Sequence, residues 1–298
     1  MKEINTTTFI AALSLFCYLD LKAQSPDDIL KQLKTTSERS AAGRRIYPNT
    51  SDSRRVETAD KGQKPIATIL ACSDSRVPLE YIFDVGYGDI FVVRVAGNVC
   101  DVDETGSIEY GVGHLGTPLL IIMGHTSCGA VTAVAKGSEV HGSIPQLVDN
   151  IAPAVEKTKK SNPNLSIDQL IPLAIKQNVW QSIEDLLTRS DEVRKLAKNG
   201  KAKIVGAVYD IRSGKIEWLG THPNESKFLS IPSSHTDHHK NGAHAADSHD
   251  KHHDKLHLEK IIPWVSIGLS SVVLILFILV LRSVKKLRSK IDGGNTGK

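Results

Sequence analysis

The chain has 298 residues, of which 40% are hydrophobic and 23% are charged, so a fully disordered or collagen-like protein is excluded. The net charge of +4 arises in the carboxyl-terminal tail, whose six basic residues after position 281 face only Asp292; without the tail's +5 the remainder carries −1. A nucleic-acid binder would need a clustered basic face, which this near-neutral body lacks. The four cysteines, at positions 17, 72, 100 and 128, are too few for a disulfide-stabilised small domain.

Residues 1–25 have the pattern of a secretory signal peptide. A short apolar stretch runs from Phe9 to Leu19, and Ala23 supplies a small residue near a cleavage site. Cys17 follows Phe16 rather than the small residue of a lipoprotein cleavage site, so it is not a lipidation site. We expect the signal to be cleaved, with an uncleaved anchor or a plain helix as the alternatives.

Residues 26–221 carry the alternating pattern of one α/β domain. The sequence predicts a helix over 26–40, a loop or extended arm over 41–62, and a strand over 215–219 at the edge, antiparallel to its neighbour. Continuously apolar strands separated by helices are typical of a parallel sheet buried on both faces. The fold class is therefore α/β, with a mostly parallel sheet of about four strands plus an antiparallel edge strand, and helices on both faces. The parallel strands are predicted at 66–71, 90–95, 119–124 and 203–210.

Three further stretches of this domain are predicted to be helical. Residues 109–115 and 130–136 lie in two of them, and the third is a long region over 144–198. Since proline interrupts helical hydrogen bonding, breaks are expected in this region near Pro153, Pro163 and Pro172.

Residues 222–260 form a predicted flexible linker. Eight of the twelve histidines lie between positions 235 and 257, among Asp, Lys, Ser and Ala, and such a composition cannot bury a core. The histidines could serve as a solvated spacer, capture zinc or buffer protons.

Residues 261–281 form 21 positions without a charge, which as a helix span roughly 30 Å, the thickness of a bilayer core. The sequence therefore predicts one transmembrane helix, followed by a basic tail over 282–298. By the positive-inside rule the tail lies in the cytoplasm and the α/β domain on the periplasmic, extracytoplasmic side. The partners expected from these features are a membrane and no nucleic acid.

Two motifs that carry the chemistry follow the ends of predicted strands, at residues 71–76 (Ala-Cys-Ser-Asp-Ser-Arg) and 124–130 (Gly-His-Thr-Ser-Cys-Gly-Ala). Because the carboxyl ends of neighbouring parallel strands meet at one crevice, Cys72, His125 and Cys128 should converge there. Two thiolates and an imidazole suit zinc and leave a fourth position for water. Zinc lowers the pKa of that water to about 7, which generates a hydroxide nucleophile.

These motifs resemble those of the β-class carbonic anhydrases, and the resemblance extends from about residue 63 to 219. It implies reversible hydration of carbon dioxide to bicarbonate and a proton by zinc-bound hydroxide, with one Zn²⁺ per subunit. By the same likeness Cys72, His125 and Cys128 are the metal ligands. The other matching segments are Gly88–Arg94, Ala96–Asn98, Ser107–Tyr110 and Gly206–Asp210.

The resemblance also implies two catalytic residues, Asp74 and Arg76. In the family the Asp accepts a hydrogen bond from zinc-bound water, or in a closed form becomes the fourth ligand, and the Arg holds it in place. Members that close the site with bicarbonate carry Trp three residues before the first Cys ligand. Ile69 occupies that position here, which favours the open form.

The substrate pocket implied by the resemblance contains Gln63, Phe91, Tyr110 and Gly129. In the family the partner subunit of an obligate dimer lends the two aromatic residues, so the expected assembly is a homodimer or a higher even oligomer. Gly129 sits where the family places a backbone N–H near the substrate. His114 is either a further pocket residue or a structural histidine.

Other departures and functions stay open at this point. Val95 follows Arg94 where the family often has Asn, which leaves the local polarity of the pocket unsettled, and Cys100 is expected to be a buried inert thiol.

Hydrolysis of carbonyl sulfide or carbon disulfide on the same zinc site is a second possible activity. A third reading is a non-catalytic, zinc-buffering membrane protein that uses the His-rich linker.

Overall fold

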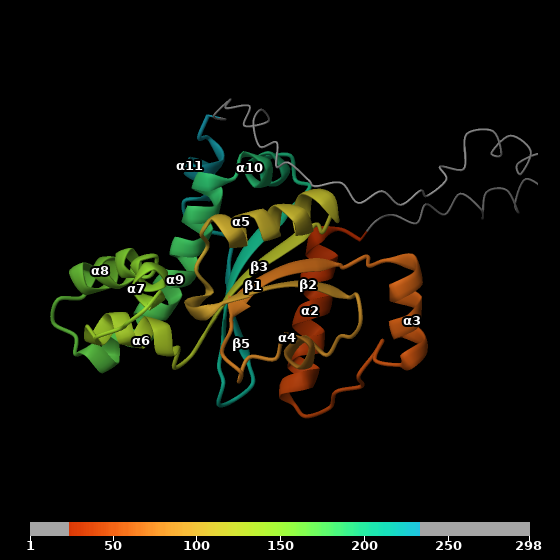
Figure 1. The fold of residues 1–298 in the computed structure, drawn as a ribbon, viewed down its shortest axis with the longest axis horizontal. Coiled ribbons are helices and arrows are strands. Elements are labelled where there is room, and N and C mark those ends of the chain that lie inside the picture. The colour runs from red at the N-terminus through yellow and green to blue at the C-terminus, as the bar shows by residue number, and fades with distance from the viewer. Residues whose placement is uncertain (1–23, 233–298) are drawn as a thin grey trace, which may run out of the picture. The chain divides into compact units, whose positions relative to one another are not determined.

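The computed structural model describes residues 24–232, which form a five-stranded sheet with helices on both faces (Figure 1). The strand order across the sheet is β2-β1-β3-β4-β5. The first four strands pair in parallel and β5 pairs antiparallel with β4, which confirms the predicted fold class of this domain. The strands are β1 (Ala67–Cys72), β2 (Ile90–Val95), β3 (Leu119–His125), β4 (Lys203–Tyr209) and β5 (Ile216–Gly220).

The helices lie between the strands and at both ends of the described region. They are α2 (Pro26–Ala41), α3 (Asp52–Lys61), α4 (Leu79–Phe83), the 3₁₀ turn η1 (Ala96–Asn98), α5 (Val102–Glu109), the π turn η2 (Tyr110–His114), α6 (Gly129–Lys136), α7 (Ile144–Asp149), α8 (Ala152–Ser161), α9 (Ile167–Arg189), α10 (Asp191–Lys198) and α11 (Glu225–Leu229).

Two apolar cores lie on the two faces of the sheet because successive residues of a strand point to opposite sides. Leu70 and Ile122 belong to a core that α5, α6, α8 and α9 close, whereas Ile69 and Ile121 belong to one that α2 and α4 close. Every residue of β1 and of β3 is buried. This two-sided burial explains why both strands are mostly apolar, with Thr68 in β1 and His125 at the end of β3 as the polar residues.

Helix α9 packs closely on β3 and β4 because two of the strand residues that face it, Gly124 and Gly206, are glycines. A Cβ atom at Gly124 would lie 2.9 Å from Val179 Cγ2, and one at Gly206 would lie 2.9 Å from Trp180 Cζ3. A side chain at either position would push the helix outward. The 23-residue helix therefore runs directly beside the carboxyl-terminal end of β3.

The prediction of a loop or extended arm over residues 41–62 is wrong in part, since this segment contains α3. Ser51 caps the helix, and its hydroxyl oxygen accepts a hydrogen bond from the backbone N–H of Arg54. None of its ten residues is buried. The helix thus has no apolar stripe, and the pattern that reveals amphipathic helices is missing from its sequence.

One predicted helix break is also wrong. The long helical region does break near Pro153, in the first turn of α8, and at Pro163, but Pro172 lies inside α9 and does not interrupt it. The stretch 109–115 is helical as predicted, since it consists of the end of α5, the η2 turn and its cap Leu115. Helix α5 begins earlier, at a capping box in which Asp101 caps the helix and Glu104 accepts from the Asp101 N–H.

The folded unit continues past residue 221, where the linker was predicted to begin. His222 is buried, and α11 packs against α9 and α10. The predicted signal 1–25, the remainder of the linker, the predicted span 261–281 and the tail 282–298 lie wholly or mainly outside the described residues. Within residues 24–232, no helix is both long and apolar enough to cross a membrane.

Candidate metal centre

The carboxyl ends of β1 and β3 bring the three predicted metal ligands together. Cys72 is the last residue of β1 and His125 the last of β3, and the two strands are neighbours in the sheet. Cys128 follows directly before α6. One ligand atom from each of the three residues lies within 4.8 Å of the others, and all three residues are buried.

A tight loop between His125 and Cys128 makes this convergence possible. Ser127 has a φ of 56°, a left-handed conformation that reverses the chain within one residue. Thr126 anchors the loop to the end of β4, because its N–H donates to the Tyr209 carbonyl at 2.9 Å and its Oγ1 accepts from Ile211 N at 3.1 Å. The second thiol is thereby placed beside the first one.

His125 has its metal-facing nitrogen available. Its Nδ1 lies 2.9 Å from the carbonyl oxygen of Thr126, so Nδ1 carries the proton and Nε2 has a free lone pair. Nε2 is buried, and no hydrogen-bond partner for it exists among the described residues. A buried polar atom without a partner is unfavourable unless a ligand pairs with it, so the site fits a metal ion.

The two thiols share one negative charge. The pKa of Cys72 is lowered to about 4, first because Cys128 donates a hydrogen bond to it, and also because the Gly97 N–H favours the thiolate. The pKa of Cys128 is raised, because its proton bonds to that thiolate and because it is buried. A divalent cation replaces such a proton and stabilises both thiolates, which is the usual state of zinc-binding cysteines.

Asp74 lies beside the metal-binding atoms, held by Arg76. Its Oδ1 accepts hydrogen bonds from Arg76 Nε and from the Arg76 backbone N–H, both at 2.9 Å, and its Oδ2 accepts from Arg76 Nη2 at 2.7 Å. The Arg76 guanidinium keeps the pKa of this carboxyl well below its ordinary value. Asp74 Oδ2 lies 3.8 Å from His125 Nε2, which puts an ionised acceptor next to the metal position.

Arg94 is a part of the site whose role the sequence did not reveal. From the neighbouring strand β2, its Nε donates to the Cys72 carbonyl at 3.1 Å and its Nη2 donates to the Asp74 carbonyl at 2.7 Å. Arg94 therefore fixes the backbone that carries the first thiol and the carboxylate. Its signal in the sequence is a single charged residue within the apolar run of β2.

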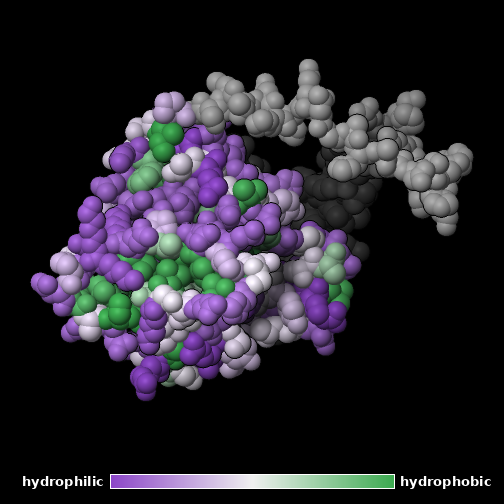
Figure 2. All heavy atoms as spheres, turned by 60° about the vertical axis from the view of Figure 1, so that its left-hand side comes forward, coloured by the Kyte–Doolittle hydropathy of each residue, from purple (hydrophilic) through white to green (hydrophobic). Residues whose placement is uncertain are grey.

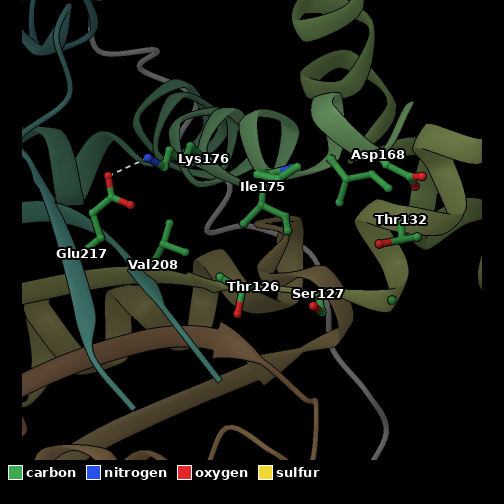
Figure 3. A pocket seen from close by; sticks show the side chains of 11 residues that line it. Thr126, Ser127, Thr132, Asp168, Ile175, Lys176, Val208 and Glu217 are labelled. Carbon is green, nitrogen blue, oxygen red and sulfur yellow. Dashed lines mark hydrogen bonds and ion pairs between the residues drawn. The ribbon is translucent and has the colours of Figure 1, made fainter. Parts of the chain in front are cut away.

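A cavity of about 640 Å³ opens beside the loop that carries Cys128 (Figure 3). Gly129 lines it, and a Cβ atom there would meet no other atom within 4 Å, so a small molecule has room next to this position. In Figure 3 the Lys176–Glu217 ion pair stands at one end of the cavity and Asp168 at the other. None of the three metal-binding residues lines the cavity.

Gln63, Phe91 and Tyr110 do not join the metal centre of their own chain. Phe91 pairs with Thr68, four residues before Cys72, and so lies about 13 Å from the level of the thiol along the strands. The Tyr110 ring contacts Phe91 at 5.7 Å between centroids and stacks on His114 at 4.7 Å. Gln63 is exposed in the loop before β1.

Cys100 is the buried, unreactive thiol that the sequence predicts. It is fully buried, and burial raises its pKa to about 12. Its Sγ lies 3.5 Å from the hydroxyl oxygen of Thr105, and it belongs to no group of metal-binding side chains among the described residues.

Comparisons with known proteins agree with this site. Residues 67–216, half of the chain, match the family model described as carbonic anhydrase. The chain belongs to the β-carbonic anhydrase family. Carbonic anhydrase 2 of Mycobacterium tuberculosis is 38% identical over 189 residues, covering 62% of this chain and 88% of that protein. The Mycolicibacterium smegmatis carbonic anhydrase is 35% identical over 191 residues, covering 63% of this chain and 90% of that protein.

Solved β-carbonic anhydrases have the same fold. A tetrameric enzyme of Sordaria macrospora superposes with a TM-score of 0.52 at 25% identity, covering 62% of this chain and 94% of its own. An Aspergillus fumigatus enzyme gives 0.53 at 25% identity, covering 67% and 92%. The activity is therefore the reversible hydration of carbon dioxide, with zinc as cofactor. Both of the relatives described above are named carbonic anhydrases, which favours this activity over the other two considered from the sequence.

Proposed function

We propose that Cys72, His125 and Cys128 hold the zinc ion and that Asp74, fixed by Arg76, orients the reacting water beside it. The observation that carries this assignment is the buried, unpartnered Nε2 of His125 next to two thiols. Zinc held by these residues would supply Lewis-acid chemistry, which would make water a nucleophile at neutral pH.

Asp74 and Gly129 supply the polar contacts of the reaction. Because Arg76 keeps Asp74 ionised, its carboxylate accepts a hydrogen bond from the attacking water and turns the water's lone pair away from itself, towards carbon dioxide. The Gly129 N–H at the start of α6 favours the oxygen of carbon dioxide on which negative charge develops. The open space around Gly129 admits that oxygen.

Substitution of each ligand tests the assignment. Cys72→Ala, His125→Ala and Cys128→Ala should each lose zinc and stopped-flow carbon dioxide hydration together, because two remaining ligands do not hold the ion. Cys100→Ala is the matched control, since it removes a buried thiol outside the site, and it should keep both. One zinc per chain and near-normal rates in any ligand variant would refute the assignment.

We further expect the pocket to be completed by a partner subunit. Phe91 and Tyr110 lie away from the zinc site of their own chain, and Gln63 precedes the end of β1 opposite to Cys72, so these residues would line a site on a second copy. Figure 2 shows apolar side chains gathered on the face that α6 to α9 form. Among the exposed large apolar residues are Ile144 of α7 and Ile167 of α9. Association of subunits would cover apolar surface of this kind. The Sordaria macrospora enzyme is itself tetrameric.

Mixed dimers test this arrangement. A Cys72→Ala chain and a Gln63→Ala chain, each inactive alone, should together form a dimer with one intact site, because the Gln63→Ala chain keeps its zinc ligands and receives Gln63 from its partner. Co-expressed chains with different affinity tags should recover measurable activity after tandem purification. If Gln63 acted within its own chain, every site of the mixed dimer would stay inactive.

We also expect the domain to be exported and anchored. The signal pattern over 1–25, the uncharged stretch 261–281 and the basic residues after it support a periplasmic, extracytoplasmic domain with a cytoplasmic carboxyl terminus. Removal of residues 261–298 should move the activity from the membrane fraction to the soluble periplasmic fraction. Activity that remains with the membranes after this deletion would contradict the proposed anchor.

A further inference from the structure

Helix α9 holds a turn of unusual backbone conformation next to the metal centre. Gly97 and Asn98, directly after β2, both have left-handed φ angles, of 73° and 47°. Asn178 Nδ2 donates to the Gly97 carbonyl at 2.7 Å, and Ser182 Oγ donates to the Asn98 carbonyl at 2.8 Å. Asn178 and Ser182 are four residues apart on α9, so one face of the helix holds both carbonyls of the turn.

The same turn contacts a metal ligand. The Gly97 backbone N–H donates to Cys72 Sγ at 3.2 Å. Gly97 is confined on its other side, since a Cβ atom there would lie 2.6 Å from Ile151 Cδ1 and 3.2 Å from Ala130 Cβ. Asn178 therefore donates a hydrogen bond to the carbonyl of Gly97, the residue whose N–H donates to the Cys72 sulfur.

Asn178 is an unfavourable residue for a purely structural role. Its side chain is almost fully buried, at 1% exposure, and its Oδ1 has no hydrogen-bond partner among the described residues. An apolar side chain of similar size would remove this unpaired oxygen, but it would also deprive the Gly97 carbonyl of its donor. The hydrogen bond that the Asn178 side chain makes is the one from its NH₂ group to the Gly97 carbonyl.

We infer that Asn178 is a positioning residue for the zinc ligand Cys72, acting through the Gly97 N–H. The hydrogen bond to sulfur withdraws charge from the thiolate, so the thiolate donates less charge to zinc and the ion remains a stronger Lewis acid. Groups that orient metal ligands in this way typically change metal affinity or activity 10- to 100-fold when they are removed. The inference rests on the proposed zinc-ligand assignment.

The test is Asn178→Leu in the full-length protein, with cobalt(II) in place of zinc. Without the hydrogen bond from Asn178 to the Gly97 carbonyl, the hydrogen bond from the Gly97 N–H to Cys72 Sγ weakens, and the Cys72 thiolate becomes easier to oxidise. The thiolate-to-cobalt charge-transfer band should therefore move to longer wavelength. In the zinc protein, kcat for carbon dioxide hydration should fall by about tenfold while KM stays within a factor of two.

Thr158→Val is the matched control. It also replaces a buried polar side chain on a neighbouring helix, but the Thr158 hydroxyl donates to Ala154 of its own helix and not to the turn. This variant should keep the wild-type band and kcat. If Asn178→Leu does not fold, Asn178→Ala and Ser182→Ala replace it and should shift the band in the same direction.

The outcomes separate this inference from the ligand assignment. A wild-type cobalt protein without thiolate charge-transfer bands would overturn the assignment of Cys72 and Cys128 as ligands. If wild type shows the bands and the Asn178 variants leave them unmoved at equal metal content, only the role of Asn178 is overturned. A shift as large in Thr158→Val as in Asn178→Leu would also overturn that role.

Discussion

Replacement of Asp74 by Asn separates a catalytic carboxylate from one that only shapes the loop. Asn has the same size but keeps one acceptor oxygen, and its NH₂ group would occupy one of the two oxygen positions. The two contacts of Oδ1 can persist when the amide oxygen faces Arg76 Nε and N–H. The NH₂ group then stands where Oδ2 was, 3.8 Å from His125 Nε2, and cannot accept a hydrogen bond from the attacking water.

The magnitude follows from these contacts. The variant loses one charge-assisted hydrogen bond, from Arg76 Nη2 to Asp74 Oδ2. Because the Arg76 side chain is 53% exposed, the free energy of unfolding should change by less than about 1 kcal/mol. The reaction loses its oriented acceptor. We therefore expect a rate reduction of at least about tenfold, which corresponds to ~1.4 kcal/mol of barrier. Arg76→Ala should reduce the rate similarly, because the carboxylate is then free to take the fourth position on the metal.

The assay is stopped-flow carbon dioxide hydration from pH 7 to 9, with zinc per chain measured on the same samples. Asp210→Asn is a matched control, since Asp210 Oδ1 also accepts two backbone N–H bonds, in the turn before β5, and its replacement should leave the rate unchanged. Full zinc content and a wild-type rate for Asp74→Asn across this range would show the proposed role to be wrong.

Three further predictions concern stability and the linker. Burial lowers the pKa of His222, and the opposing effect of Glu184 does not offset it, so the fold favours the neutral ring. Its contribution to stability is complete above about pH 6.5 and is lost as the pH falls below that value, so the melting temperature should drop less in His222→Gln than in wild type between pH 7 and 5. Asp84→Asn should lower the free energy of unfolding by about 2–3 kcal/mol in urea titrations, because this buried carboxylate pairs with Arg39 and accepts two backbone N–H bonds. Deletion of residues 235–257 should leave the hydration rate of zinc-replete protein unchanged in strong buffer, because the predicted linker contributes no metal ligand to the site.

Each of these has a result that would contradict it. Parallel pH profiles of melting temperature for wild type and His222→Gln would show that the ring does not titrate on unfolding. Unchanged urea stability in Asp84→Asn would mean that the carboxylate contributes no net free energy. A tenfold loss of rate after the deletion would place the histidines in the reaction.

The sequence alone determined the fold class and the group of candidate metal-binding side chains, because both depend on short-range patterns. Strands buried on both faces are continuously apolar, so their positions could be found to within one or two residues. Cys72 and His125 end two such strands, and parallel pairing places strand ends together whatever the details of packing. The amphipathic pattern over residues 26–40 likewise predicted α2, whose buried face contains Ile29 and Leu33.

Only the tertiary structure decided how the site is held and which residues stay apart. Arg94 and Asn178 reach the site from β2 and α9, and Asn178 donates to a carbonyl 81 residues away in the chain. Helix α3 escaped detection because it buries nothing, and Pro172 was accommodated within α9. Such contacts join residues distant in sequence through backbone groups that every amino acid possesses. The side-chain pattern carries no trace of them until the chain is folded.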